Sequence, residues 1–533
     1  MAQAAPQEAA LEIRVETQKL KRGLTLLPLV GIIYFTVCGG TFGVEALFGN
    51  DGSGPGLGIV MLFVVPLIFS VPIMLMVNEM NSMMPVEGGY YHWIKQAFGP
   101  FAGFLAGWAN LVVSWLDASI YPVLGAAYLA FFIPALNEGM TIGGLEIPGT
   151  TLSFIIGAVF IWAITALQMR GARLTGLTAN WIGLLILVPL TLMTLIGISN
   201  WLCFGMDSLP FLPQDQAVSV DSLSAAFGLG MWVVMWNYMG FELATVAGDE
   251  IVNPKRTYPM AMVIVLILAV ATYVLPVTAG LFGGGGADGR YLLWGVETSA
   301  DTNIGTVMQD AGVEQATIES WGVDPTSTSG WYLPDIAQAV GEKAAGTDSP
   351  LPGFLGSLMT IAAALAMIGL FIGNSLGASR IPFALAEDGM MPKWLVRVSP
   401  RYGTPWAAIL LAGVIYTVFA TNAFAFLVVA DVFLNTLVLV ACFFALWKLR
   451  ASRPELPRKR VPGGRVGLAL ITLGPIAVLA VAVYSQVNDV GWDSVTLALG
   501  SLVVGALLYF PIRRWIKPGI PDIDPFQTGL GPA

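Results

Sequence analysis

The sequence predicts an all-α integral membrane protein with twelve transmembrane helices. Of its 533 residues, 56% are hydrophobic and only 11% are charged, whereas a soluble domain carries about 25% charged residues. The apolar residues form long runs without the alternation of outer-membrane strands, and about 20 apolar residues cross a bilayer as a helix. The composition also excludes a disordered chain, a disulfide scaffold and a nucleic-acid-binding protein.

Twelve apolar runs reach the length of a membrane span. They cover residues 26–48, 57–80, 98–132, 151–169, 174–204, 224–248, 257–282, 352–379, 405–422, 424–447, 464–485 and 494–512. The first 25 residues carry three Glu, and no cleavage site follows the first run. We therefore expect no removable signal peptide.

The cations predict the orientation, because Lys and Arg gather at the cytoplasmic ends of membrane helices. With both termini in the cytoplasm of a plasma (inner) membrane, every Lys and Arg except Arg290 and Lys343 falls on the cytoplasmic side. The two exceptions share the long loop 283–350, which holds ten of the 34 acids. We expect this loop to be partly ordered and to cover the outer surface.

The predicted division of the chain follows the spans. It comprises a cytoplasmic segment 1–25, a first repeat 26–204 (spans 1–5), a second repeat 224–447 (spans 6–10) with the acidic extracellular loop 283–350, spans 11 and 12 in 464–512, and a cytoplasmic tail 513–533.

Spans 1 and 6 each place glycine beside a carboxylate. Span 1 contains Cys38-Gly39-Gly40-Thr41 followed by Glu45, and span 6 contains Trp236-Asn237-Tyr238-Met239-Gly240-Phe241-Glu242. Such sequences disfavour a continuous membrane helix, because glycine has a low helix propensity and a carboxylate is costly within the bilayer. Span 6 is five spans after span 1, and an odd offset makes the two halves run in opposite directions. This pattern indicates an inverted repeat whose two broken helices build a site at the midplane.

A broken helix exposes N–H groups that suit an anion and C=O groups that suit an ammonium group or Na⁺. Gly39 and Gly40 permit close approach of a ligand because they lack a Cβ atom. The alternative is that these glycines only permit helix packing. The matched pair of breaks, each with a carboxylate, favours a site.

Four carboxylates fall within predicted spans: Glu45, Asp117, Glu242 and Asp431. Each costs roughly 2.5–3.5 kcal/mol or more when charged at the centre of an isolated helix. No Lys or Arg lies in a span core, so these groups are neutral and bonded to neighbouring helices, or they bind protons or a cation. Asp117 and Tyr121 share one helical face. A carboxylate beside a phenol suits an ammonium ligand or a proton relay.

Aromatic residues lie near both breaks and could line an apolar or cation–π pocket. They are Tyr34, Phe42, Trp236, Tyr238 and Phe241. The three Cys have no CxxC spacing, and the sequence contains a single His, so we expect no metal, no cofactor and no disulfide.

Several motifs together resemble the amino acid–polyamine–organocation superfamily, in particular its polyamine-uptake and L-type amino-acid transporter-like branch. The resemblance covers about residues 20–510. The motifs are 39–45 (GGTFGVE), 85–90 (PVEGGY), 117–124 (DASIYPVL), 247–250 (AGDE) with Asn253-Pro254, 386–392 (AEDGMMP) and 401–405 (RYGTP).

The resemblance implies a LeuT-type 5+5 inverted repeat and secondary active transport by alternating access. Spans 1, 2, 6 and 7 would move as a bundle against spans 3, 4, 8 and 9. Residues 38–41 would hold a substrate carboxylate, and the break of span 6, at Gly240, would hold its amino group. Glu45, Asp117 and Glu242 resemble the acids that polyamine carriers use for additional ammonium groups.

The coupling ion is H⁺ or Na⁺. Some proton-coupled relatives carry a Lys in span 5, but 174–204 has neither Lys nor Arg. Asn374, Ser375 and Ser379 in span 8 could ligate Na⁺, or they could serve polar packing. Glu45, Asp117, Glu242 and Asp431 are the candidate proton sites.

Our leading hypothesis is a carrier for cationic amines, polyamines or amino acids, bound at the two breaks. The alternative is a proton-coupled permease or exchanger for neutral or branched amino acids, with the carboxylates as proton sites. A membrane enzyme would need a metal cluster or a nucleophile–base pair, and the sequence has no HExxH motif. A channel would show a single pore lining rather than two antiparallel broken helices. The expected partners are the small-molecule substrate and the lipid bilayer.

Overall fold

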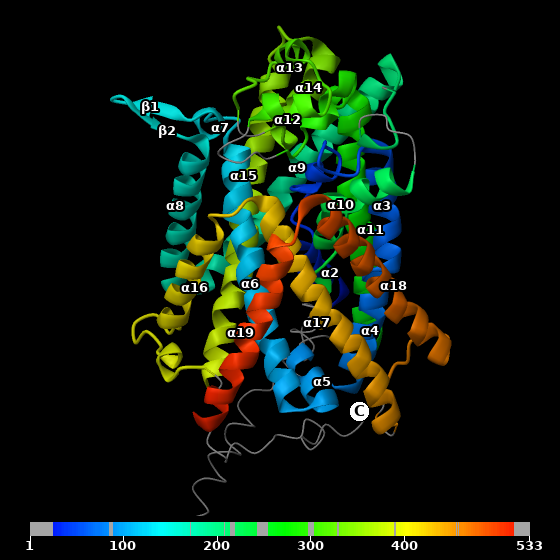
Figure 1. The fold of residues 1–533 in the computed structure, drawn as a ribbon, viewed down its shortest axis with the longest axis vertical. Coiled ribbons are helices and arrows are strands. Elements are labelled where there is room, and N and C mark those ends of the chain that lie inside the picture. Colours follow the sequence, from blue (N-terminus) through cyan, green and yellow to red (C-terminus); the bar gives the residue numbers. More distant parts are fainter. Residues whose placement is uncertain are drawn as a thin grey trace, which may run out of the picture.

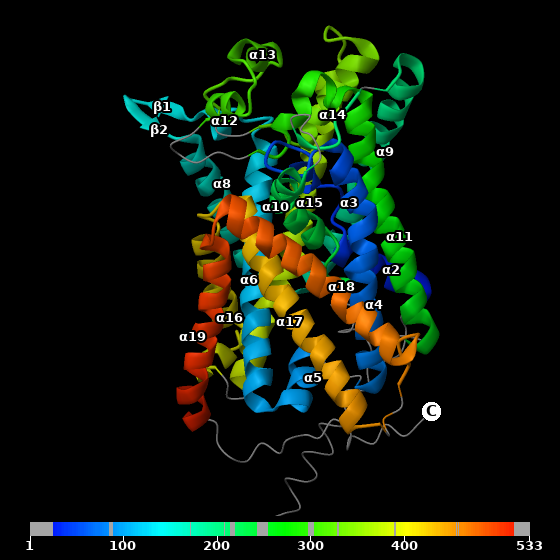
Figure 2. The same cartoon turned by 45° about the vertical axis from the view of Figure 1, so that its right-hand side comes forward.

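The computed structural model is mostly helical, with its long helices running between two ends of one bundle (Figures 1 and 2). We name these the α14 end and the α5 end, after α14 (Leu333–Ala345) and α5 (Gly89–Phe98), which lie there. The structure describes residues 25–84, 89–170, 172–206, 208–213, 219–241, 254–296, 303–327, 330–387, 391–454, 456 and 458–515.

Nine helical stretches of the described residues are long and apolar enough to cross a membrane. They lie in α3 (Pro55–Ile68) with α4 (Ser70–Met83), α6 (Pro100–Leu129), α8 (Gly149–Met169), α9 (Ala172–Phe204), α11 (Pro254–Gly280), α15 (Leu351–Glu387), α17 (Phe424–Ser452), α18 (Gly464–Ser485) and α19 (Asp493–Trp515). The prediction of a helical, multi-pass membrane protein is therefore confirmed.

The other three predicted spans contain shorter or less apolar helices. These are α2 (Leu26–Val37), α10 (Val220–Asn237) and α16 (Trp406–Phe419). Two of these helices end where the sequence predicts a break. The number of twelve spans stays a prediction.

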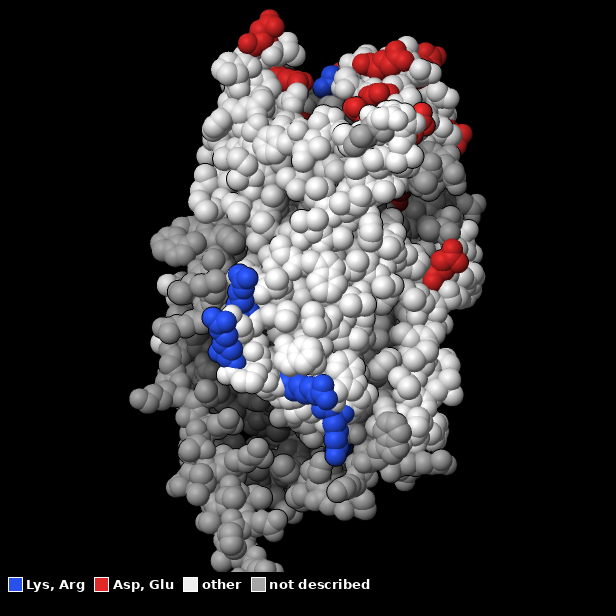
Figure 3. All heavy atoms as spheres, turned by 90° about the vertical axis from the view of Figure 1, so that its left-hand side faces the viewer, with Lys and Arg blue, Asp and Glu red and all other residues white. Residues whose placement is uncertain are grey.

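The outside of the bundle is apolar. Val159 on α8, Leu195 on α9 and Ile267 on α11 are each more than 60% exposed, which suits contact with lipid rather than water. On the face shown in Figure 3, most Asp and Glu gather at the α14 end, most Lys and Arg lie nearer the α5 end, and the surface between them is mostly uncharged.

Helices α6 and α17 form the interior of the bundle. In their most apolar windows 72% of residues are buried, against 22% in α8 and α19. Asp117 and Asp431 thus lie on the two most enclosed helices. Gly99, with a φ of +94°, and Pro100 begin α6, because proline is favoured in a first helical turn.

Short elements cover the α14 end. We call the described residues of 287–345 the cap: η5 (Ala287–Leu293), α12 (Ile304–Asp310), α13 (Gln315–Ser320) and α14. A π-helical segment, η4 (Leu281–Gly285), joins α11 to the cap. Beside it lie α7 (Ala135–Glu138) and a hairpin of β1 (Met140–Ile142) and β2 (Leu145–Ile147), in which Met140 pairs with Ile147. Loop 283–350 is therefore largely folded.

A buried ion pair ties distant helices together at the α5 end. Arg450 of α17 donates from Nε to Oε1 of Glu79 in α4 over 2.6 Å and from Nη2 to Oε2. The backbone N–H of Val461 also donates to Glu79 Oε2, over 2.7 Å. Glu79 has no exposed surface, so its charge depends on these three donors.

Candidate functional site

The first predicted break falls between the end of α2 and a single 3-10 turn, η1 (Val44–Leu47). Helix α2 ends at Val37, and Cys38 leaves the helical conformation with φ −127° and ψ 99°. Gly40 has a φ of +107°, which side chains disfavour. A Cβ atom on Gly39 would overlap Leu370 of α15, so the break packs directly against that helix.

Hydroxyl groups satisfy backbone carbonyls around this break. Tyr273 of α11 donates to the carbonyl oxygen of Val37 over 3.2 Å. Thr41 donates to the carbonyl oxygen of Thr272 over 2.6 Å. That carbonyl lies four residues before Pro276, and a proline removes the helical N–H that would otherwise bond it. Thr41 therefore replaces the hydrogen bond that Pro276 removes.

Glu45 is bonded to a tyrosine that the sequence analysis did not single out. Tyr128 of α6 donates to Glu45 Oε1 over 2.8 Å and accepts from the N–H of Gly43 over 2.7 Å. Glu45 has no exposed surface, and its Oε2 has no hydrogen-bond partner among the described residues. The carboxyl group of Glu45 thus has one buried oxygen that no described side chain satisfies, with the backbone of Leu333 and Gly43 close to it.

Asp117 is the centre of a second cluster. Tyr121 donates to both oxygens of Asp117, at 3.0 and 3.1 Å, and the indole N–H of Trp236 donates to Oδ1 over 3.1 Å. Asn374 of α15 donates to the hydroxyl of Tyr121 over 2.9 Å. The predicted neighbours Asp117, Tyr121 and Trp236 are therefore brought together, and Asn374, predicted for a sodium site, joins them.

Aromatic rings surround the Asp117 cluster. The ring of Trp236 lies 6.3 Å from that of Tyr121 and 5.7 Å, edge to face, from that of Phe424. A Cβ atom on Gly43 would lie 3.0 Å from Trp236. Phe42 packs edge to face on Tyr128 at 5.4 Å. The first break, α6, α10 and α17 thus meet around one group of rings.

Tyr238, beside the second predicted break, is bonded outside this cluster. It follows the last residue of α10 and is fully buried. Its hydroxyl donates to the carbonyl oxygen of Leu62 in α3 over 2.8 Å. Leu62 lies four residues before Pro66, so Tyr238 also replaces a hydrogen bond that a proline removes. Gly240, with a φ of +98°, follows.

Other predicted residues are placed around the cluster. Asp431 is buried on α17 and lies within electrostatic range of the Tyr121 hydroxyl. Tyr416 of α16, another residue that the sequence analysis missed, lies within the same range of Asp117. Tyr34 shares a 2.7 Å hydrogen bond with Thr272.

Ser375 is held within the helix packing. It donates to the carbonyl oxygen of Phe371 and accepts from Gln168 of α8 over 2.5 Å. Residues 373–377 read GNSLG, the spacing of a nucleophile elbow, but that motif requires a strand-to-helix turn and here α15 is continuous. Ser379 is also buried. The sodium site at Asn374, Ser375 and Ser379 stays a prediction.

Glu242 lies outside the described residues, as do parts of three motifs, at 85–88, 247–250 with 253, and 388–390. A signal for Tyr128 was present in the sequence, since it lies seven residues after Tyr121 and shares its helical face. No local signal pointed to Tyr416.

The chain is similar to known transporters over nearly its whole length. A family model described as amino acid permease matches residues 27–507. Polyamine transporter PUT1 of Oryza sativa subsp. japonica is 28% identical over 517 residues, which cover 96% of this chain and 84% of that protein. Polyamine transporter RMV1 of Arabidopsis thaliana is 27% identical over 502 residues, which cover 93% and 86%. The chain therefore belongs to the amino acid permease family and is a transporter rather than an enzyme.

Proposed function

We propose that the chain is a secondary active transporter for cationic amines, with linear polyamines as the favoured substrates. One observation carries this proposal: two carboxylates, Asp117 and Glu45, are each bonded to a tyrosine on the same face of α6. Tyr121 and Tyr128 are seven residues apart, which corresponds to about 10.5 Å along the helix axis. The proposed site thus has two carboxyl poles, one at each of these tyrosines.

The separation suits a polyamine with three amino groups. Three bonds of an extended chain span about 3.3–3.6 Å, so the nine bonds between the terminal nitrogens of spermidine span about 10–11 Å. Putrescine, with five such bonds, is about half as long and reaches one pole at a time. The rings of Trp236 and Phe424 would pack on the methylene groups and attract the ammonium groups.

The charge of the proposed site supports a cationic substrate. In the described part of the chain, no Lys or Arg side chain forms an ion pair or a hydrogen bond with Asp117 or Glu45. A bound ammonium group would provide the missing positive charge. The names of the relatives PUT1 and RMV1 point to the same class of substrate.

For mechanism we propose alternating access in a twelve-span, LeuT-type inverted repeat, with both termini on the cytoplasmic side of the plasma membrane. A reciprocal contact supports the repeat. Thr41 at the first break bonds a carbonyl freed by Pro276 in α11, and Tyr238 at the second break bonds a carbonyl freed by Pro66 in α3. In a five-plus-five repeat, span 1 corresponds to span 6 and span 2 corresponds to span 7. The contact between spans 1 and 7 would therefore correspond to the contact between spans 6 and 2.

Coupling to H⁺ or Na⁺ stays within this proposal. Asp117, Glu45, Asp431 and Glu242 are the proposed proton sites. Uptake driven separately by a pH gradient and by a sodium gradient would identify the ion.

Uptake by proteoliposomes tests the proposed function. We expect saturable uptake of labelled spermidine, inhibition by excess putrescine, and loss of uptake in Asp117→Asn. Asp348→Asn, which removes an exposed acid after α14, is the matched control and should transport normally. Leucine uptake that ignores a hundredfold excess of either polyamine would favour the alternative, a neutral amino-acid permease, and overturn the proposal.

A further inference from the structure

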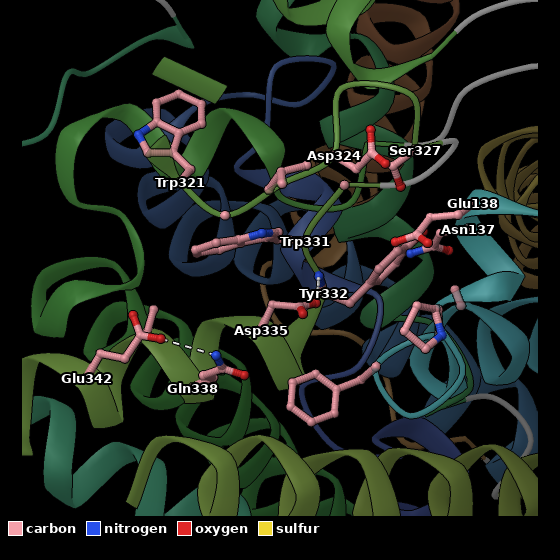
Figure 4. A pocket seen from close by; sticks show the side chains of 18 residues that line it. Asn137, Glu138, Trp321, Asp324, Ser327, Trp331, Tyr332, Asp335, Gln338 and Glu342 are labelled. Atoms are coloured by element: carbon pink, nitrogen blue, oxygen red, sulfur yellow. Dashed lines mark hydrogen bonds between the residues drawn. The ribbon is translucent and has the colours of Figure 1, made fainter. Parts of the chain in front are cut away.

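A cavity lies at the α14 end, apart from the two predicted breaks. Its volume is about 410 Å³, within the range of sites that enclose small molecules. It lies between the cap and the chain that follows α6 (Figure 4). Neither the sequence motifs nor the proposed function uses this cavity.

Acids and aromatic rings dominate the side chains that face the cavity. The carboxylates come from separate elements: Glu138 ends α7, Asp324 follows α13, and Asp335 and Glu342 lie on α14. Trp321, Trp331 and Tyr332 supply the rings (Figure 4). Carboxylates beside electron-rich ring faces form a surface that attracts organic cations.

One organic cation of the chain, Arg290, contacts two residues of this surface, although it is not itself a lining residue. The guanidinium carbon of Arg290 lies 5.6 Å from the ring centroid of Trp331, and its Nη1 lies 3.8 Å from Oε2 of Glu342. Both partners line the cavity. One ring and one carboxylate that line the cavity therefore already bind a cation of this protein. This contact supports cation binding separately from the presence of four acids.

The remaining carboxylates keep free oxygens. Asp335 Oδ2 accepts from the N–H of Tyr332 over 2.9 Å, and Asp324 Oδ1 accepts from Thr326. These bonds use one oxygen of Asp324 and leave its other oxygen, and the exposed carboxylate of Glu138, available to a ligand. Arg290 neutralises one of four acids, so the cavity keeps a net negative charge.

The cavity is connected to the proposed transport site through two rings. Tyr332 lines the cavity and packs edge to face on Tyr128, with centroids 5.5 Å apart. Tyr128 in turn donates to Glu45. The contact between Tyr332 and Tyr128 thus lies between the cavity and the Glu45 pole.

We propose that this cavity is a second binding site for linear di- and polyamines, which collects the substrate next to the Tyr332–Tyr128 contact before it reaches Glu45. The ammonium groups bind Asp324, Asp335 and Glu138, and the methylene groups lie on the rings of Trp331 and Tyr332. Arg290 occupies the Glu342 end and competes with the ligand for that acid. The proposal rests on the proposed function for its substrate class, but binding at the cavity is measurable without transport.

Equilibrium binding of labelled spermidine to the purified full-length chain tests this site. We expect two saturable sites in the unmodified protein and one in Asp117→Asn. Adding Asp324→Asn and Asp335→Asn to that variant should weaken the remaining site at least tenfold, which corresponds to about 1.4 kcal/mol. Adding Asp348→Asn instead should leave the remaining site unchanged.

Arg290→Gln should change the affinity of the cavity for spermidine in the opposite direction. Removing the competing cation should tighten spermidine binding in the Asp117→Asn background several-fold, whereas a merely structural role for Arg290 predicts weaker binding. The same affinity with and without the Asp324→Asn and Asp335→Asn pair would overturn the cavity site, and so would weaker binding in Arg290→Gln. Cavity binding without any amine uptake would contradict the proposed function alone.

Discussion

The hydroxyl of Tyr238 donates a 2.8 Å hydrogen bond to the carbonyl oxygen of Leu62. That carbonyl needs a donor because Pro66, four residues later, has no N–H. Both Tyr238 and Leu62 are fully buried, so water cannot replace the hydroxyl. The contact holds the end of α10 against α3, as the bond from Thr41 to Thr272 holds the chain after α2 against α11.

Tyr238→Phe should lower the stability of the protein. It leaves a buried carbonyl without a partner, which costs about 1–3 kcal/mol. Adding Pro66→Ala supplies the helical N–H, so the double variant should recover part of the loss. Thermal unfolding of the four proteins in detergent measures the coupling. Equal losses for Tyr238→Phe with and without Pro66→Ala would show that the freed carbonyl is not the cause.

The ion pair between Arg450 and Glu79 at the α5 end predicts that substitutions of these two residues have coupled effects on stability. Arg450→Met leaves the buried Glu79 charge without its main partner, which should cost about 3–5 kcal/mol. Adding Glu79→Gln removes the uncompensated charge, so the double variant should unfold at a higher temperature than Arg450→Met. Lys459→Met, which removes a cation from the nearby loop, is the control and should change little. A double variant less stable than either single variant would contradict this account.

Acid should weaken amine binding in the cavity. Burial raises the pKa of Asp335 to about 6, above its ordinary value. The carboxyl is therefore charged above pH 6 and becomes neutral as the pH falls through about 6, while an aliphatic amine stays protonated. Glu138, Asp324, Glu342 and Arg290 are the other charged groups around the cavity.

The measurement is spermidine affinity between pH 5 and pH 8 in the Asp117→Asn background. Affinity should fall toward pH 5, and the step near pH 6 should disappear when Asp335→Asn is added. A step of unchanged size in that variant would assign the titration to another group.

Tyr128→Phe should impair use of the Glu45 pole without disrupting the Asp117 cluster. It removes the hydrogen bonds to Glu45 and to the N–H of Gly43 but keeps the ring that packs on Phe42 and Tyr332. We expect a several-fold higher KM for spermidine and a smaller change for putrescine. Equal changes for both amines would argue against a separate pole at Glu45.

The sequence was sufficient for features that depend on composition or on helical spacing. Long apolar runs predicted the membrane helices, and the four-residue spacing of Asp117 and Tyr121 predicted their contact. Glycines beside carboxylates predicted where α2 and α10 end. In each case the signal lies within one helix or one turn.

Contacts between segments that are far apart in the sequence could not be predicted from local spacing. Tyr128 and Glu45 are 83 residues apart, and Arg450 and Glu79 are 371 apart, so only the packing of the helices pairs them. Asn374 was considered for Na⁺, and its bond to Tyr121 depends on how α15 meets α6. The cavity requires the folded cap. Pro66 and Pro276 do indicate that the carbonyls four residues earlier lack a helical partner. They do not indicate which hydroxyl group bonds each carbonyl.

The central claim is that Asp117 and Glu45 bind the two ends of one polyamine. Competition of putrescine and spermidine against labelled spermidine uptake, measured in the unmodified protein and in Glu45→Gln, tests it most directly. The account predicts that the unmodified protein prefers spermidine, and that Glu45→Gln loses this preference while still binding putrescine. An unchanged preference for spermidine in Glu45→Gln would contradict the two-pole site.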